Sequence, residues 1–132
     1  MKKVILLVMA IILAAWIKAG AQDDPFEPII KAIQASDARS LSDAFNVTVE
    51  LRLPDNENTY SASQAEMIMK DFFRKYPPDS FNVVQKGTTG ADSKFAICNY
   101  LSGSSQYQVY IQLRKEKERH LINKIKFDEK KP

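Results

Sequence analysis

Apolar residues follow a helical spacing early in the chain and an alternating spacing over most of its remainder. In residues 26–33 they recur every three or four positions, which predicts a helix. Asp24-Pro25, just before them, offers a capping carboxylate and a favourable first helical residue. Ser36-Asp37 offers a second cap, so we expect a second short helix with Leu41, Ala44 and Phe45 on one side.

From residue 47 the apolar period changes from about 3.6 to 2. Residues 47–53 alternate apolar with polar side chains, which predicts a half-buried strand. A short extended piece around Tyr60 leads into Ser61–Gln64, which has the pattern of a capping box. The helix that follows should have its apolar residues on one side along residues 65–76, and it should end at Pro77-Pro78.

From Phe81 to the end we expect four strands, and the turns between them indicate the register. Gly90-Ala91 fits a two-residue turn with glycine first, and Gly103-Ser104 centres the next turn. The last turn contains no Gly, Asn or Asp; we expect a three-residue loop, because a shift by one residue would place Lys124 and Lys126 among apolar side chains.

These turns predict three sets of neighbours. Across the first turn they are Thr89 with Asp92, Gln85 with Ala96, Val83 with Cys98 and Phe81 with Tyr100. Across the second they are Tyr100 with Tyr107, Cys98 with Val109 and Ala96 with Ile111. Across the third they are Leu113 with Leu121, Ile111 with Asn123, Val109 with Ile125 and Tyr107 with Phe127.

The same registers assign each strand residue to one of two faces. The inner face, which the helices should cover, consists of Phe81, Val83, Gln85, Ala96, Cys98, Tyr100, Tyr107, Val109, Ile111, Leu113, Leu121, Asn123, Ile125 and Phe127. The outer face consists of Val84, Phe95, Ile97, Asn99, Leu101, Gln108, Tyr110, Gln112, His120 and Ile122.

Polar groups on the inner face define a candidate ligand cavity. Gln85 and Asn123 interrupt apolar rows, and a buried amide without partners costs about 1–3 kcal/mol. Either water, backbone or tyrosine hydroxyls satisfy these amides, or they face a cavity that takes a small apolar ligand. The candidate lining is Gln85, Cys98, Tyr100, Tyr107 and Asn123.

The outer face is too apolar for a freely solvated sheet, and exposed apolar patches often mark an interface. We therefore expect a homodimer through this face. Its candidate residues are Val84, Phe95, Ile97, Leu101, Tyr110 and Ile122. The alternative is that they are scattered singly and need no partner.

The first 21 residues have the pattern of a cleaved secretory signal peptide. Lys2 and Lys3 precede the apolar run Val4–Ile17, and Ala19-Gly20-Ala21 is a small-residue cleavage pattern. A membrane span needs about 20 apolar residues, and Lys18 interrupts this run first. We expect an exported protein, periplasmic or extracellular, with a single domain over residues 22–132 and no membrane attachment after cleavage.

Charge and cysteine content limit the function further. The chain has 19 Lys and Arg against 16 Asp and Glu, and removing the three lysines of residues 1–21 leaves a neutral domain. A neutral domain lacks the counterion release that supports nucleic-acid binding. Cys98 is the single cysteine, which allows no intramolecular disulfide, and we interpret it as a small buried hydrophobe instead of a reactive thiol.

We expect no metal, no cofactor and no catalytic residue. One histidine and one cysteine cannot build a three- or four-ligand metal site without clustered carboxylates. The predicted inner face carries no group that titrates near neutrality, which a cavity acid or base requires. Asp71 lies beside the apolar side of its helix, and we interpret it as a solvated surface carboxylate.

The order helix, helix, strand, short strand, helix, four strands resembles the nuclear transport factor 2-like (NTF2-like) superfamily, also described as cystatin-like. Within it the chain resembles domain of unknown function 4783 (DUF4783), a family of exported Bacteroidetes proteins. The resemblance rests on Ser36-Asp37 with Leu41 and Phe45, Val49-Glu50-Leu51, Tyr60-Ser61, Gln64-Ala65, Asp71-Phe72-Phe73, residues 81–87 and Tyr107-Gln108-Val109-Tyr110.

This resemblance implies an α+β fold, in which a curved, mainly antiparallel sheet wraps around N-terminal helices and one longer helix. It brings no assigned catalytic residue. Three functions remain open: a non-catalytic domain that binds a small ligand or protein partner, an isomerase- or dehydratase-like enzyme, and a structural self-associating domain. We favour the first.

Overall fold

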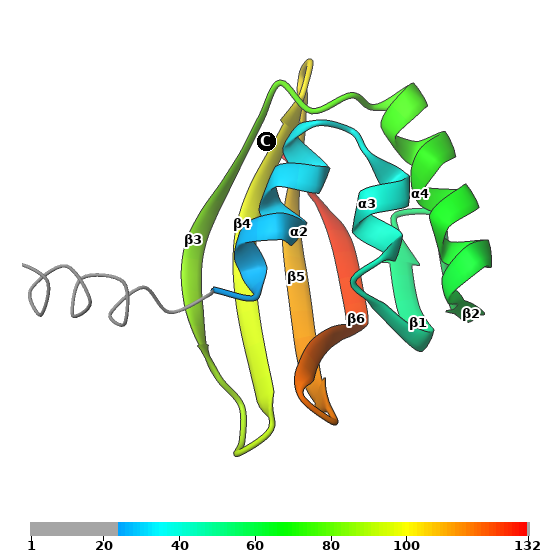
Figure 1. The fold of residues 1–132 in the computed structure, drawn as a ribbon. Helices are drawn as coiled ribbons and strands as arrows, with labels where there is room; N and C mark the ends of the chain where they lie inside the picture. Colours follow the sequence, from blue (N-terminus) through cyan, green and yellow to red (C-terminus); the bar gives the residue numbers. More distant parts are fainter. Residues whose placement is uncertain (1–23, 132) are drawn as a thin grey trace, which may run out of the picture.

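A computed structural model describes residues 24–131 as helices packed on one side of a single curved sheet (Figure 1). The predicted signal peptide, residues 1–21, lies outside the described residues. The helices are α2 (Phe26–Gln34), α3 (Ala38–Ser42) and α4 (Ala62–Lys75). The strands are β1 (Phe45–Leu53), β2 (Asn56–Ser61), β3 (Ser80–Thr88), β4 (Ser93–Ser102), β5 (Ser105–Glu116) and β6 (Arg119–Lys130).

The starts of α3 and α4 follow the predicted caps, whereas α2 begins one residue later than predicted, with Pro25 instead of Asp24 at its N-cap position. Asp24 Oδ1 accepts a hydrogen bond from the Phe26 N–H at 2.9 Å, and Asp37 Oδ1 accepts from the Ser40 N–H at 3.1 Å. At the start of α4, Ser61 and Gln64 form the expected reciprocal capping box. Each cap satisfies backbone N–H groups that have no partner within the helix.

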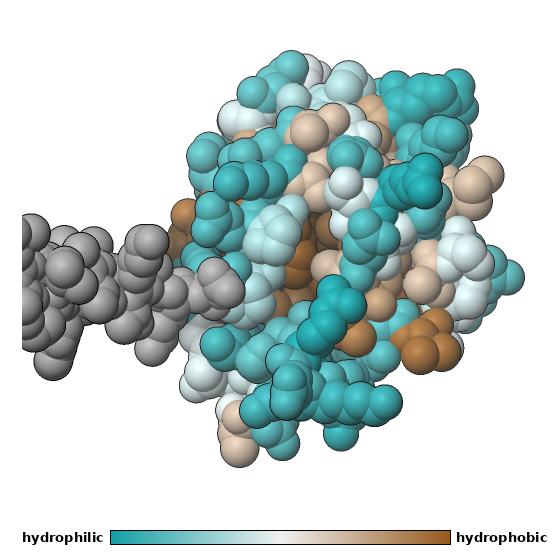
Figure 2. All heavy atoms as spheres, in the orientation of Figure 1, coloured by the Kyte–Doolittle hydropathy of each residue, from teal (hydrophilic) through white to brown (hydrophobic). Residues whose placement is uncertain are grey.

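The strands are ordered β2-β1-β6-β5-β4-β3, and only the β1–β6 contact among these neighbours is parallel. The inward side chains of β1, β4, β5 and β6 meet the apolar sides of the helices in one core. Most of the surface seen from the helix side is hydrophilic, and hydrophobic residues gather in a hollow near its centre (Figure 2). The predicted α+β architecture is confirmed.

No helix within residues 24–131 is long and apolar enough to cross a membrane.

The register between β4 and β5 is as predicted. The three expected pairs, Tyr100 with Tyr107, Cys98 with Val109 and Ala96 with Ile111, lie opposite one another. Gly103 in the connecting turn has φ 56°, a left-handed conformation that glycine adopts without steric cost.

The register between β3 and β4 is correct only up to a β-bulge at Val84. Phe81 faces Tyr100 and Val83 faces Cys98, as expected, but Gln85 then faces Ile97 and Lys86 faces Ala96. The extra residue in β3 reverses the side of every later side chain on that strand. The inward placement of Gln85 was therefore wrong: its side chain is exposed.

The turn after β3 also differs from the prediction. Thr88 pairs with Lys94, and the Thr89 N–H donates to the Ser93 carbonyl at 3.0 Å, so Thr89 does not pair with Asp92. Gly90 does not have the positive φ that the expected two-residue turn requires at its first position.

All four predicted pairs between β5 and β6 are wrong. The strands are joined through a two-residue turn in which Lys117 takes a φ of 57°, a conformation that a residue other than glycine rarely adopts. A bulge at Asn123 then shifts the register by one more residue. The observed pairs are Leu113 with Ile122, Ile111 with Ile125, Val109 with Phe127 and Tyr107 with Glu129.

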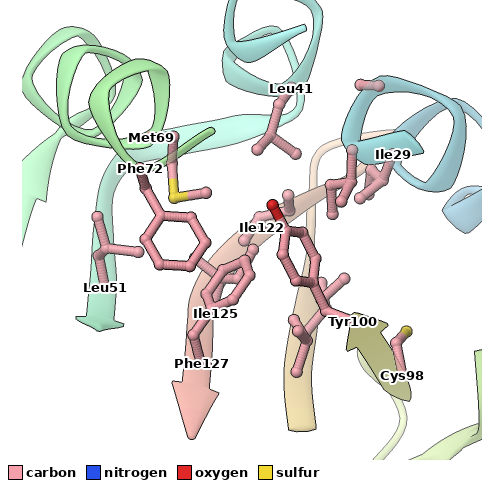
Figure 3. Close-up of a cluster of buried hydrophobic side chains, with 14 of the residues drawn as sticks. Ile29, Leu41, Leu51, Met69, Phe72, Cys98, Tyr100, Ile122, Ile125 and Phe127 are labelled. Carbon is pink, nitrogen blue, oxygen red and sulfur yellow. The ribbon is translucent and has the colours of Figure 1, made fainter. Parts of the chain in front are cut away.

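This bulge changes which residues of β6 lie inside. Ile122, which we had placed on the outer face, is fully buried in the core beneath the helices (Figure 3). Leu121 faces Arg114, and Asn123 occupies the bulge, so neither belongs to the inner row as predicted. Because the extra residue restores the alternation, Ile125 and Phe127 still point inward, in agreement with the prediction.

Candidate functional site

The structure does not bring the five predicted cavity residues together. Cys98 and Tyr100 are fully buried in the core, and Tyr107 lies at its edge. Gln85 is exposed on the edge strand β3, and Asn123 is half-buried at the bulge of β6. The Asn123 Oδ1 atom is buried and accepts no hydrogen bond from the described residues.

Aromatic rings fill the interior between α4 and the sheet. Phe72 of α4 lies at their centre, with ring centroids 4.9–5.8 Å from those of Tyr76, Tyr100, Tyr107 and Phe127. The Tyr100 hydroxyl donates a hydrogen bond to the backbone carbonyl of Tyr76, which ties the end of α4 to β4. The packing around these rings therefore depends on both the helix and the sheet.

Two fully buried side chains, those of Cys98 and Tyr100, carry groups that can ionise. Burial raises the pKa of the Cys98 thiol to about 12, and it also raises the pKa of Tyr100, with Tyr107 and Asp79 as smaller causes. A nucleophilic cysteine needs the opposite shift, toward the thiolate. The interpretation of Cys98 as a buried hydrophobe agrees with its position in the core.

Carboxylates lie outside this interior. Ser102 is the one buried residue of polar or charged type within residues 24–131. Asp71 bonds Arg74 at 2.6 Å and Lys75 at 3.2 Å on the surface of α4, and these hydrogen bonds hold the pKa of its carboxyl below the ordinary value. In the described part of the chain, no three His, Cys, Asp or Glu side chains are grouped so as to hold a metal ion.

An open cleft lies at the C-terminal end of α4, where the helix passes the β1–β2 turn. We call it the α4 cleft. It has a volume of about 350 Å³. Its lining is Leu53, Asp55, Asn56, Met67, Ile68, Asp71, Phe72, Lys75 and Tyr76.

A smaller recess of about 200 Å³ lies beside the α4 cleft, at the start of β5 and the end of β6. We call it the tyrosine recess. It shares three lining residues, Asp55, Phe72 and Tyr76, with the α4 cleft. Its lining is Pro54, Asp55, Phe72, Tyr76, Ser105, Tyr107 and Glu129.

The tyrosine recess combines aromatic and acidic groups. The Tyr76 ring lies 6.1 Å from Tyr107 and 5.3 Å from Phe72, and 41% of its surface is exposed. Burial raises the pKa of Tyr107; the carboxylates Glu129 and Asp55 add to this rise, and a hydrogen bond with Ser105 opposes it. Such a recess can hold a small organic group against its rings.

Of the residues in the recess, only Tyr107 had been predicted as part of a site. Tyr76 had been assigned to the apolar side of α4. The one available signal was the pair Phe72 and Tyr76, an i, i+4 aromatic pair directly before Pro77-Pro78, where a helix must end.

The outer face of the sheet carries most of the residues predicted for an interface. Phe95, Ile97, Leu101 and Tyr110 are half-buried there, Val84 is 61% exposed at the bulge of β3, and Ile122 is absent because it lies in the core. The rings of Phe95 and Tyr110 stack, with centroids 6.2 Å apart and planes 18° from parallel.

Because Gly87 has no side chain, the Phe95 ring of this stack can lie directly against β3. A Cβ atom at this position would lie 2.6 Å from Phe95 Cε1, so any larger residue would force the ring to move. The Phe95 ring therefore covers the glycine of its partner strand, which fixes its position on the outer face.

Comparisons with known proteins place the chain among domains whose function is unknown. A family model described as "Domain of unknown function (DUF4783)" matches residues 26–128. The crystal structure of a DUF4783 family protein from Bacteroides ovatus is 24% identical and has a TM-score of 0.77, over 85% of this chain and 100% of that chain. A comparison with curated proteins finds no match.

Two more distant structures share the fold. A ketosteroid isomerase-like protein from Erwinia carotovora is 14% identical with a TM-score of 0.65, over 80% of this chain and 90% of that chain. A domain of unknown function with a cystatin-like fold from Nostoc punctiforme is 11% identical with a TM-score of 0.63, over 80% of this chain and 72% of that chain. At these identities the likeness concerns the fold alone.

Proposed function

The chain belongs to the DUF4783 family, with an NTF2-like fold, and we propose that it is a non-catalytic binding domain that acts after export. Its ligand is a small molecule that occupies the tyrosine recess and extends into the α4 cleft. The observation that supports this proposal is the half-exposed Tyr76 ring, which forms a wall common to both spaces. Concave sites with apolar walls and a few polar groups are typical of small-molecule binding.

Binding fits the chemistry of the chain better than catalysis. An isomerase- or dehydratase-like enzyme would use a carboxylate or an activated tyrosine in the interior between the helices and the sheet. Here burial raises the pKa of Tyr100, and the carboxylates Asp55 and Glu129 lie on the exposed rim of the recess. Neither arrangement favours proton transfer at neutral pH.

A fragment screen by NMR tests the binding proposal. We expect small aromatic and aliphatic fragments to shift the amide signals of residues around Asp55, Tyr76 and Tyr107. Tyr76→Ala should weaken the best fragment about tenfold, since one lost ring contact is worth roughly 1–1.5 kcal/mol. Tyr110→Ala, a tyrosine on the outer face, is the matched control and should leave the affinity unchanged. Fragments that bind only elsewhere would refute the proposal.

A second candidate function is self-association through the outer face, and the stacked Phe95 and Tyr110 favour it. No helix covers this face in the described part of the chain. On β6 the patch is bordered by Lys126, which lies opposite Tyr110, and by Lys124, which lies opposite Gln112 and 3.5 Å from Glu50. A second copy suits this face where it covers the apolar side chains of β4 and leaves these lysines at the rim.

Light scattering tests this self-association. We expect a dimer, and Tyr110→Asp or Ile97→Asp should weaken it because each substitution places a charge in the apolar centre. Ser104→Asp, in the exposed β4–β5 turn, is the control and should leave the mass unchanged. A wild-type protein that stays monomeric at high concentration would exclude the dimer.

A further inference from the structure

We infer that the tyrosine recess selects an organic ammonium cation. This inference rests on the proposed ligand site and names the chemistry of its ligand. It follows from two features of the lining: three aromatic rings, and two carboxylates with no basic side chain beside them in the recess.

The aromatic rings provide the first part of the argument. Phe72, Tyr76 and Tyr107 line the recess together, and each pair of their ring centroids lies within 6.1 Å. The face of an aromatic ring carries negative electrostatic potential, which attracts a cation. Tyr76 offers the most accessible ring surface, with 41% of the residue exposed, whereas Phe72 and Tyr107 are 5% and 3% exposed and form the floor of the recess. Quaternary and alkylated ammonium groups suit such a site because they are weakly hydrated and present apolar methyl groups to the rings.

The carboxylates provide the second part. Asp55 and Glu129 come from the β1–β2 turn and the end of β6, so they approach the recess from separate elements. Within residues 24–131 neither has a Lys, Arg or His partner within 4.0 Å, whereas Asp71 in the adjoining α4 cleft is paired with both Arg74 and Lys75. Their charge is therefore available to a bound ligand.

The same features disfavour other ligand classes. An anion would meet two carboxylates and no cation inside the recess, and a neutral apolar molecule would gain nothing from them. The α4 cleft, beside the recess, has a mixed lining: Leu53, Met67 and Ile68 are apolar, and Lys75 lies there 3.2 Å from Asp71. A ligand with an ammonium head in the recess and a short tail of mixed polarity along the cleft matches both parts.

Choline and 3,3-dimethyl-1-butanol, its neutral isostere, provide the direct test. We expect NMR titration of the purified protein to show choline binding about tenfold more tightly, since a cation against an aromatic ring is attracted to it and the neutral isostere is not. The shifted signals should map to Tyr76, Ser105 and Tyr107. Added salt should reduce the difference, because the two carboxylates are exposed.

Variants of the two carboxylates test whether the recess recognises the charge of the ligand or only its shape. Asp55→Asn and Glu129→Gln should each weaken choline several-fold and leave 3,3-dimethyl-1-butanol unchanged. Both side chains are exposed, so the substitutions preserve the fold. Glu57→Gln, an exposed carboxylate on β2 outside the recess, is the matched control and should have no effect.

The outcomes distinguish this inference from the proposed function. If the neutral isostere or an anionic analogue binds the recess as well as choline does, the cation preference is wrong. The proposal that the recess is a ligand site is then still supported. If no fragment of any charge shifts the recess signals, the proposed function itself fails. If choline binds but Asp55→Asn and Glu129→Gln leave its affinity unchanged, the carboxylates do not select the ligand and the inference is refuted.

Discussion

Phe72→Ala should lower the free energy of unfolding by about 3–5 kcal/mol, the range for removing a buried aromatic ring from a packed core. Phe72 is 5% exposed and joins α4 to the sheet. Its ring contacts the aromatic rings of Phe73, Tyr76, Tyr100, Tyr107 and Phe127. These neighbours come from both layers, so they cannot close the resulting cavity without separating the helix from the strands. Equilibrium unfolding in urea measures the loss.

Met67→Ala is the matched control on the same helix. Met67 is 64% exposed, and truncating it should change the unfolding free energy by no more than about 0.5 kcal/mol. A loss below about 1 kcal/mol for Phe72→Ala would mean that the aromatic cluster does not hold the two layers together. Phe72→Leu should recover part of the stability, because it restores apolar volume without the ring.

The helices and one strand pair could be predicted because their signals are local, although Phe45, which was expected on the second helix, begins β1. Ser61–Gln64 marks the start of α4 by side chains that bond the first turn of the same helix. Gly103, with its positive φ, sets the turn from which the β4–β5 register follows residue by residue. In each case the residues that determine the geometry lie within a few positions of it.

The two bulges could not be predicted because their cause is not local. Val84 and Asn123 are each an extra residue in a strand, and each reverses the facing of the residues after it. The expected three-residue loop after β5 also placed Ile125 and Phe127 inside. It did so because a turn longer by one residue changes the side of these residues in the same way as the bulge does. Alternation alone cannot distinguish a bulge from a change of turn length, since both restore the same pattern.

The candidate site was mostly missed for the same reason. The tyrosine recess is built from the β1–β2 turn, the end of α4 and the ends of β5 and β6. Tyr107 could be found because it lies in a strand with the correct register. Asp55 and Glu129 come together only when β1 and β6 pair in parallel, and nothing in either segment predicts that contact.

Cys98 should react with a thiol reagent at least about a thousandfold more slowly in the folded protein than in the unfolded chain. Its pKa rises to about 12 from an ordinary value near 9, which lowers the thiolate fraction at pH 8 by roughly that factor. The side chain is also 0% exposed, so the reagent cannot reach the sulfur atom without local or global opening. The rate of labelling is measured from the absorbance of the coloured group that the thiol reagent releases when it reacts.

The urea dependence of this rate identifies the opening that exposes the thiol. Cys98 lies on the central strand pair β4–β5, so we expect the rate to rise with the globally unfolded fraction. Cys98→Ala combined with Ser104→Cys moves the thiol to the exposed turn and should react quickly without urea. Equally fast labelling of the native Cys98 would place the sulfur at the surface, and the inner row of β4 would then have to face the opposite way.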